Sequence, residues 1–322
     1  MKILVTGAAG FIGFHMSSRL LAEGHEVVGL DNLNAYYSVE LKRRRLAILG
    51  RSKNFTGISG DICDLALIKK IFRRYKFKKV CHLAAQVGVR YSLVNPFIYQ
   101  KSNNEGFLNI LEAGRHFGVE RLVYASSSSV YGGNHNLPFN ERDRVDNPVS
   151  LYAATKKYNE LAAHVYGHLY GLQTVGLRLF TVYGPWGRPD MAVWLFTDAI
   201  SRGKTIKVFN HGKMRRDFTY IDDIVGGMRS ALFTGGLRRS AVYNLGNHRS
   251  EKLMDLIGII AKCLGRKPKM KFLPIQPGDV KDTYADIKRA QKDLHFHPAT
   301  DLAHGIPEFV AWYRDAGYEK QR

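Results

Sequence analysis

Two side chains suited to acid–base chemistry, Tyr152 and Lys156, lie four residues apart within a stretch of helical periodicity, 151–170. On a helix this spacing places both side chains on one face. A free phenol has a pKa of about 10, and a neighbouring ammonium favours its ionised form. The pair therefore predicts a general base, Tyr152, that takes a proton from a substrate hydroxyl beside Lys156. Because the spacing is common by chance, a solvent-facing pair on an amphipathic helix is the alternative.

A run of four serines, Ser126–Ser129, precedes that helix and follows an apolar run at 121–125. The apolar run is typical of a strand, so the serines should lie at its carboxyl end. Ligands of parallel α/β sheets bind beyond the carboxyl ends of the strands. Position therefore favours a binding role for Ser127 and Ser128, whereas Ser129 is equally consistent with a polar loop.

A glycine-rich loop, Gly7-Ala8-Ala9-Gly10-Phe11-Ile12-Gly13, follows the first predicted strand and opens a helix. Glycines let a backbone turn sharply and approach a diphosphate without a Cβ clash. The helix N-terminus then offers free amides and a positive dipole end. Strand, loop, helix and second strand follow in the order that a dinucleotide site requires. We therefore expect cofactor contacts at Gly7, Gly10, Phe11, Ile12 and Gly13.

Asp31 ends the second predicted strand, 18 residues after Gly13, and is followed by Asn32. An acid near this position accepts hydrogen bonds from a ribose 2′-hydroxyl and repels a 2′-phosphate, so NAD is expected rather than NADP. A turn residue is the other interpretation of Asp31, and the basic run Lys42–Arg45 is the feature that favours NADP. The positive ring of oxidised NAD would further favour the Tyr152 phenolate.

Apolar runs alternate with helical patterns through the first 180 residues, which predicts a parallel sheet covered on both faces, a doubly wound Rossmann fold. The expected strands are 2–6, 26–30, 55–59, 79–83, 121–125 and 174–179, and the expected helices are 11–21, 65–75, 107–117 and 151–170. Residues 1–180 are therefore interpreted as the NAD-binding domain.

The rhythm becomes irregular after Gly184-Pro185, and residues 181–322 are interpreted as a smaller α/β lobe that binds the substrate. Its expected strands are 206–209, 242–245 and 270–273, and its expected helices are 193–202, 252–264 and 302–314. The sequence offers no clean linker between the two parts, so the chain is allowed to cross between them.

The charge balance is unusual, with 48 Lys and Arg against 28 Asp and Glu, a formal net charge of +20. Attraction of anionic ligands is one explanation, and solvated helix faces are the favoured one. Three scattered cysteines form no metal or disulfide pattern, so we expect no metal and a reducing compartment. We expect no apolar span and no leader, hence no membrane partner and a cytoplasmic protein.

The glycine spacing, GxxGxxG, resembles that of the extended short-chain dehydrogenase/reductase family, the NAD-dependent epimerases and dehydratases. Several further positions resemble the family pattern. Asp61-Ile62 corresponds to its adenine contact, Leu83-Ala84-Ala85 to the stretch under the nicotinamide half, and Asn103 to its helix asparagine. Ser127 corresponds to the catalytic Ser/Thr that binds the reacting oxygen beside Tyr152. The resemblance implies oxidation of a sugar hydroxyl by NAD, with a homodimer formed through 96–117 and 151–170.

Dehydratases of this family carry an Asp-Glu pair after the catalytic Ser/Thr, and the related decarboxylases carry a Glu nearby. This chain has Ser128-Ser129 instead. A site without extra acid–base groups can do little beyond removing and returning a hydride, which favours an epimerase.

The chain further resembles the UDP-glucuronate 4-epimerase subgroup in the segments 31–37, 84–92, 178–191 and 214–220. Ala35 and Ser38 depart from its pattern, since acids are expected there. The resemblance implies conversion of UDP-glucuronate to UDP-galacturonate, with a 4-keto intermediate whose carboxylate must be held still. The substrate contacts that it implies are Gly88, Arg90, Ser127, Ser128, Thr181, Arg188, Phe209, Arg216 and Asp279.

Two other functions stay open at this stage. One is a neutral UDP-sugar 4-epimerase, which acts on UDP-glucose and UDP-galactose. The other is a non-catalytic dinucleotide-binding protein associated with nucleic acid, which the +20 charge suggests. No RNA-binding motif accompanies that charge, so no nucleic-acid partner is expected.

Overall fold

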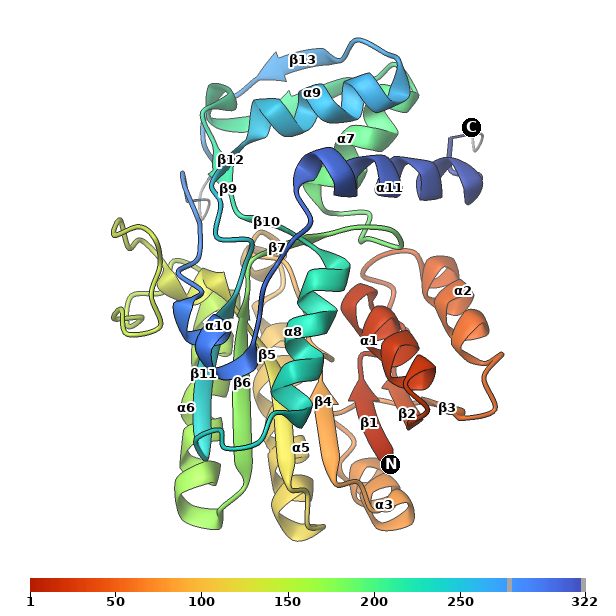
Figure 1. The fold of residues 1–322 in the computed structure, drawn as a ribbon, viewed down its shortest axis with the longest axis vertical. Coiled ribbons are helices and arrows are strands. Elements are labelled where there is room, and N and C mark those ends of the chain that lie inside the picture. Colours follow the sequence, from red (N-terminus) through yellow and green to blue (C-terminus); the bar gives the residue numbers. More distant parts are fainter. Residues whose placement is uncertain (277–279, 320–322) are drawn as a thin grey trace.

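A seven-stranded parallel sheet forms the larger part of the molecule in the computed structural model, which describes residues 1–276 and 280–319 (Figure 1). The strand order is β11-β6-β5-β4-β1-β2-β3. The strands are β1 (Lys2–Thr6), β2 (Glu26–Asp31), β3 (Phe55–Ser59), β4 (Lys79–His82), β5 (Arg121–Ser127), β6 (Gln173–Leu179) and β11 (Ser240–Leu245). The doubly wound fold expected from the sequence is confirmed.

Central strand β1 shows why these apolar runs form a buried sheet. Ile3, Leu4 and Val5 have no exposed surface. Leu4 lies in the apolar cluster under one face of the sheet, whereas Ile3 and Val5 belong to the cluster on the other face. Strands buried on both faces need apolar side chains at every position, which is the pattern that the sequence shows.

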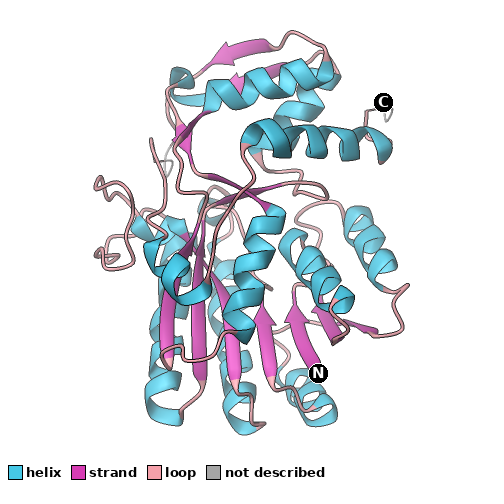
Figure 2. Cartoon of the chain, viewed as in Figure 1, coloured by secondary structure: helices cyan, strands magenta, loops and turns pink. Residues whose placement is uncertain are grey.

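Helices cover both faces of the sheet (Figure 2). One face carries α3 (Leu65–Tyr75), α5 (Gly106–His116) and α6 (Leu151–Tyr170). The other carries α1 (Phe11–Ala22) and α8 (Ile221–Phe233). Two further helices, α2 (Val39–Leu49) and α10 (Lys288–Leu294), flank α1 and α8.

The smaller lobe lies over the carboxyl ends of the sheet strands (Figure 1). It contains the helices α7 (Ala192–Ser201), α9 (Leu253–Leu264) and α11 (Leu302–Asp315), and three two-stranded sheets. These sheets pair β7 (Thr181–Tyr183) with β10 (Phe218–Tyr220), β8 (Thr205–Val208) with β13 (Lys269–Phe272), and β9 (Arg215–Arg216) with β12 (Glu251–Lys252). Among the described residues, no helix combines the length and the hydropathy that a membrane crossing requires.

One strand expected in the smaller lobe belongs to the main sheet. β11 pairs in parallel with β6, in the register Ser240↔Thr174 to Leu245↔Leu179. The placement of 242–245 in the smaller lobe was therefore wrong, because position along the chain does not reveal which strand edge a segment will pair with. The chain leaves the first part, enters the smaller lobe and returns through α8.

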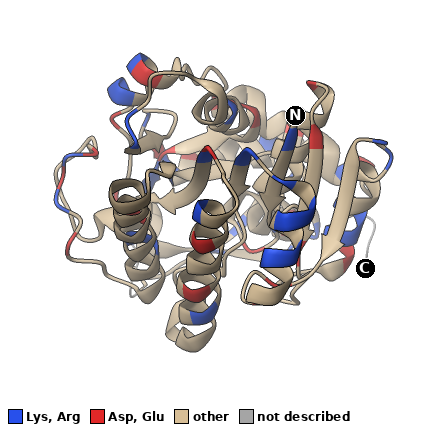
Figure 3. Cartoon of the chain, turned by 90° about the horizontal axis from the view of Figure 1, so that it is seen from below, with Lys and Arg blue, Asp and Glu red and all other residues tan. Residues whose placement is uncertain are grey.

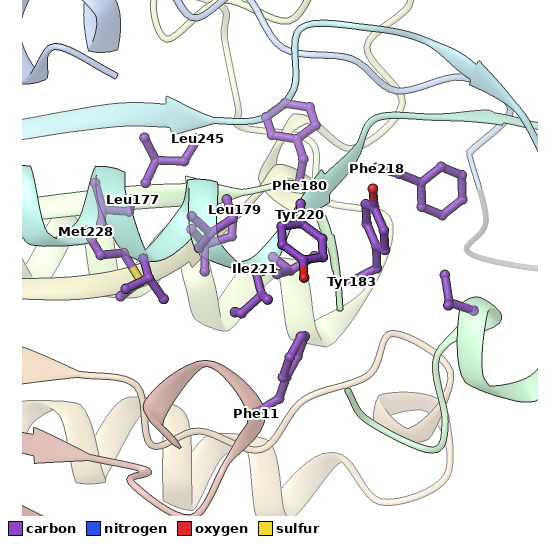
Figure 4. Packing of buried hydrophobic residues seen from close by; sticks show 14 of the residues in the cluster. Phe11, Leu177, Leu179, Phe180, Tyr183, Phe218, Tyr220, Ile221, Met228 and Leu245 are labelled. Atoms are coloured by element: carbon purple, nitrogen blue, oxygen red, sulfur yellow. The ribbon is translucent and has the colours of Figure 1, made fainter. Parts of the chain in front are cut away.

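A continuous apolar core joins the two parts of the molecule. Figure 4 shows Phe11 of α1 facing Ile221 of α8, with Leu179, Tyr183 and Tyr220 close by. All five belong to one cluster of buried residues, which extends into the smaller lobe. The smaller lobe is therefore held firmly above the strand ends, where the order of the sheet reverses between β1 and β4 and a ligand crevice is expected.

The charged runs do not form one continuous face. Seen from below, Lys and Arg are spread over several helices and loops with acidic residues among them (Figure 3). Lys69, Lys70, Arg73 and Arg74 of α3 are exposed, as a solvated face requires. Arg45 of α2 is different, because it has no exposed surface and its guanidinium is used inside the protein.

Candidate active site

A cavity of about 1060 Å³ lies between the strand ends and the smaller lobe. Of the site residues expected from the sequence, those in the described part of the chain all line it except Asn103, and Asp279 lies outside the described residues. The lining includes Gly7, Gly10, Phe11, Ile12, Gly13, Asp31, Asn32, Asp61, Ile62, Leu83, Ala84, Ala85, Gly88, Arg90, Ser127, Ser128, Tyr152, Lys156, Thr181, Arg188, Phe209 and Arg216.

The glycine-rich loop fits a diphosphate because its glycines let the loop backbone pack directly against the first turn of α1. A Cβ on Gly13 would lie 2.0 Å from the carbonyl oxygen of Gly7, so only glycine allows α1 to begin so close to the loop. Gly10 is the N-cap of α1 and supplies no side chain to its amides. The first-turn amides thus remain available to an anion, which is the requirement of a dinucleotide.

Asp31 acts both as a turn residue and as a carboxylate at the cavity wall. Its Oδ2 accepts a hydrogen bond from the Ala9 amide at 3.0 Å, and its Oδ1 accepts one from the Leu33 amide at 2.9 Å. Asn32 donates to Asp61 at 3.0 Å, which joins the ends of β2 and β3. This acidic rim fits a ribose with a free 2′-hydroxyl and opposes a 2′-phosphate.

The first residue of the basic run faces inward beside this rim. Nζ of Lys42 donates to the carbonyl and the side-chain oxygen of Asn34, at 2.6 and 2.8 Å. The ammonium also lies 4.5 Å from the centre of the Tyr37 ring. Lys42 therefore shapes the loop that follows Asp31, and its burial lowers its pKa.

The structure brings Tyr152, Lys156 and Ser127 together, as expected. Ser150 caps α6 by accepting the Ala153 amide at 3.1 Å, which starts the helix immediately before Tyr152. Nζ of Lys156 donates to the Ala125 carbonyl at 2.8 Å, so the helix is fastened to the end of β5. The Ser127 hydroxyl lies close enough to the Tyr152 phenol to lower its pKa.

The electrostatics of the pair differ in part from expectation. Burial lowers the pKa of Lys156 to about 8. Burial raises the pKa of Tyr152, while the Ser127 hydroxyl and the charge of Arg188 oppose that rise. The expected lowering of the Tyr152 pKa by Lys156 is therefore not found in the protein alone, because desolvation of the phenolate is the larger effect.

Asn103 lies behind the cavity wall, in a π-helical turn, Gln100–Glu105, that precedes α5. Its side chain accepts the Gln86 amide at 2.7 Å and donates to the Gln86 carbonyl and the Thr155 hydroxyl at 3.0 Å each. Asn103 thus fastens the segment after β4 to α6, and the cofactor contact expected for it stays a prediction.

Arg188 enters the cavity beside Tyr152, close enough for its charge to act on the phenol. Its guanidinium is paired with Asp190, which also accepts a hydrogen bond from Tyr36 at 3.1 Å. Gly88 lies next to this group with φ +99°, and a Cβ there would lie 2.6 Å from the Tyr36 hydroxyl. The glycine at this position therefore makes room for Tyr36.

The other expected substrate residues lie on the side of the smaller lobe. The Arg90 guanidinium stacks over the Phe209 ring, 5.0 Å from its centre. Arg216 donates to the carbonyls of Arg215 and Lys281, at 2.9 Å each, which directs its position at the cavity edge. These contacts place two cations and an aromatic ring where a nucleotide could lie.

Sequence reasoning missed three residues that organise the site, namely Tyr36, Arg45 and Asp190. Buried Arg45 donates to the carbonyls of Ala9 in the glycine-rich loop and of Trp186 near Arg188, at 2.8 and 2.5 Å. It thus links the glycine-rich loop to the Arg188 loop. Spacing gave no signal for Arg45, whereas the proximity of Asp190 to Arg188 in the sequence was a signal that could have been used.

Known proteins show which family shares this arrangement. Residues 3–246 match the model of the NAD dependent epimerase/dehydratase family. The chain is 50% identical over 337 residues to UDP-glucuronate 4-epimerase 2 of Arabidopsis thaliana, which covers 100% of this chain and 77% of the plant protein.

Solved structures agree over nearly the whole length. UDP-glucuronic acid 4-epimerase from Bacillus cereus, in complex with UDP-glucuronic acid and NAD, has a TM-score of 0.93 and 34% identity, covering 98% of this chain and 100% of that chain. UDP-glucose 4-epimerase from Thermotoga maritima, with UDP-glucose, has a TM-score of 0.89 and 30% identity, covering 98% of this chain and 99% of that chain. The chain belongs to the NAD-dependent epimerase/dehydratase family, and it is an NAD-dependent enzyme of that family.

Proposed function

We propose that the protein interconverts UDP-glucuronate and UDP-galacturonate by epimerisation at C4. The observation that carries the proposal is a guanidinium, Arg188, in the same cavity as the Tyr152–Ser127 pair and close to it. A cation beside the reacting carbon suits a sugar with a carboxylate at C6. Relatives named as UDP-glucuronate 4-epimerases, at 46–50% identity, support the same substrate.

The acid–base step follows from the catalytic group. The Tyr152 oxygen takes the proton of the C4 hydroxyl, and the Ser127 hydroxyl hydrogen-bonds the same oxygen atom. NAD, which the glycine-rich loop and Asp31 would hold, would supply the acceptor for the hydride of C4 and the donor that returns it. Lys156 supplies a positive charge one helical turn away, which favours the phenolate and partly offsets the effect of its burial. After the 4-keto sugar has rotated to present its other face, Tyr152 returns its proton to the C4 oxygen.

Arg188 is proposed to prevent decarboxylation of the oxidised substrate. Oxidation at C4 makes a β-keto acid, which loses carbon dioxide when the C5–C6 bond aligns with the C4 carbonyl π system. A planar guanidinium can fix a carboxylate through paired hydrogen bonds and keep it out of that alignment. Thr181 and the Gly88 backbone line the same cavity and complete the proposed carboxylate site.

The nucleotide half is assigned to the part that follows residue 180. Arg216 is proposed to bind the diphosphate, and Phe209, together with Arg90 from the first part, to border the base. Asp279 is proposed to bind the ribose. Residues 1–180 would then hold the cofactor and 181–322 most of the nucleotide sugar.

Product analysis tests this function directly. Purified protein is incubated with UDP-glucuronate and the products are resolved by NMR, with UDP-glucose as the parallel substrate. We expect UDP-galacturonate as the main product and slow or no turnover of UDP-glucose. A strong preference for UDP-glucose would instead support the neutral UDP-sugar 4-epimerase.

A homodimer is proposed through the long helices on one face of the sheet. Leu161, Val165 and Leu169 form an exposed apolar stripe at i, i+4 and i+8 on α6, and Leu108 of α5 and Phe97 are exposed as well. Such a stripe is typical of an interface between helices. In a twofold-symmetric dimer, each copy would cover the stripe of the other. Light scattering should give twice the chain mass, and Leu161→Glu should halve it; a monomeric wild-type protein would contradict the proposal.

A further inference from the structure

Asp190 holds Arg188 in one orientation at the cavity wall. Nε of Arg188 donates to Oδ1 of Asp190 at 3.0 Å, and Nη2 donates to Oδ2 at 2.5 Å. This is a side-on, bidentate ion pair, and both side chains are largely buried, with 18% and 31% exposed. The Tyr36 hydroxyl donates to the same Oδ2 at 3.1 Å, so the carboxylate is held from a second loop.

The surroundings restrict the movement of this pair further. Arg45 binds the carbonyls of Trp186 and Gly187, immediately before Arg188. Tyr36 itself packs against Gly88, where a side chain would displace it. The guanidinium is thus fixed through its own backbone, through Asp190 and through the loop that carries Tyr36.

The pairing leaves a defined set of donors for a ligand. A guanidinium has five N–H groups. Asp190 takes the Nε–H and one Nη2–H of Arg188. The outer edge, formed by Nη1 and the second Nη2–H, matches a second carboxylate in a paired, end-on geometry.

We propose that Asp190 is a positioning residue that aims the outer edge of Arg188 at the carboxylate of the sugar and so protects the keto intermediate from decarboxylation. The inference rests on the proposed function and names how its specificity is enforced. Without the anchor, Arg188 keeps its charge but can rotate about its side-chain bonds. The carboxylate then rotates with it and reaches the alignment in which the C5–C6 bond breaks.

That side reaction has a product that can be counted. The C5–C6 electron pair moves into the C4 carbonyl to form an enolate, carbon dioxide leaves, and C5 takes a proton. The result is a UDP-4-keto-pentose. If this ketone is released, the cofactor remains in its reduced form. Each keto-pentose that is released therefore leaves one reduced nicotinamide, which absorbs light, whereas each completed epimerisation leaves none.

Asp190→Asn tests the proposal because loss of Asp190 and loss of Arg188 should have different effects on the affinity for UDP-glucuronate. We expect UDP-glucuronate to bind the variant at least as tightly as the wild type, since Arg188 loses a competing anion. We expect kcat for epimerisation to fall roughly 10- to 100-fold, as misplacement of a positioned group costs, and the share of keto-pentose to rise. Tyr36→Phe removes one hydrogen bond from Asp190 and should shift the product ratio in the same direction by less.

Asp198→Asn is the matched control. Asp198 pairs with Arg202 at 2.8 Å with similar burial, 24% exposed for the arginine and 33% for the acid, and it does not line the cavity. This variant should keep the wild-type product ratio. NAD binding and the melting temperature report whether each variant is folded. If Asp190→Asn does not fold, the product ratio of Tyr36→Phe tests the proposal instead.

An unchanged product ratio and kcat in the folded Asp190→Asn protein would overturn the proposal. So would a loss of UDP-glucuronate affinity as large as that of Arg188→Ala. Failure of the proposed function shows separately, because the wild-type protein would then not epimerise UDP-glucuronate at all.

Discussion

Lys156 holds its ammonium in a buried position, and this burial should cost the protein stability. Its side chain is 4% exposed and burial lowers its pKa from 10.5 to about 8. One pKa unit corresponds to about 1.4 kcal/mol, so the charged form destabilises the folded protein by about 3 kcal/mol at pH 7. Lys156→Met keeps the length and removes the charge. It also loses the hydrogen bond to the Ala125 carbonyl, worth about 1 kcal/mol.

We therefore expect Lys156→Met to be more stable than the wild type by about 2 kcal/mol at pH 7 and to lose most turnover. For a chain of 322 residues, this gain corresponds to a rise in melting temperature of about 3 °C, from about 2 cal/mol/K of unfolding entropy per residue. The variant should thus separate stability from activity at a single side chain.

The difference in stability between Lys156→Met and the wild type should depend on pH. Below pH 8 both the folded and the unfolded chain hold the Lys156 proton, and the full penalty is present. Between pH 8 and about 10.5 the folded protein has lost this proton while the unfolded chain keeps it, so wild-type stability rises relative to the variant. The advantage of Lys156→Met should shrink across this window and become a deficit of about 1 kcal/mol above it, because the variant still lacks the hydrogen bond to the Ala125 carbonyl.

Chemical denaturation of nucleotide-free protein at pH 7, 8.5 and 10 measures the effect. Lys157→Met is the matched control, because Lys157 is the next residue and is only partly buried. It should change stability by no more than about 0.5 kcal/mol and leave turnover intact. A destabilised Lys156→Met protein, or a gain that is constant with pH, would refute the assignment of a buried charge at Lys156.

Three further predictions concern the cofactor and the substrate. Tyr152→Phe should leave NAD affinity unchanged by calorimetry and reduce kcat by at least about 100-fold; near-normal turnover would remove Tyr152 as the base. Arg188→Ala should weaken UDP-glucuronate binding by about 10-fold or more while UDP binding is retained, and equal affinities for both proteins would exclude Arg188 from the carboxylate site. Gly13→Ala should lose at least about 10-fold in NAD affinity, because a Cβ there would lie 2.0 Å from a backbone oxygen. Gly258→Ala, where a Cβ meets open space, should bind NAD normally.

Local order in the first part of the chain was predictable because the signals are local. The strand at 2–6 and the helix at 65–75 begin and end where expected, since apolar runs and helical periodicity follow directly from side-chain order. The strand at 242–245 was expected in the smaller lobe, and this was wrong for the opposite reason. Its partner β6 lies more than 60 residues away in the chain, and only the free edge of the folded sheet selects it.

The sequence by itself determined the chemistry that is available, namely a phenol and an amine on one helical face, serines at a strand end and glycines before a helix. These features depend on spacing along one element, which fixes the direction of each side chain. The tertiary structure decided how those groups are tuned and aimed. Burial shifts the pKa values of Tyr152 and Lys156, and Tyr36 reaches Asp190, the partner of Arg188, from a second loop. Desolvation and contacts between distant segments exist only in the folded chain, so local sequence patterns do not predict them.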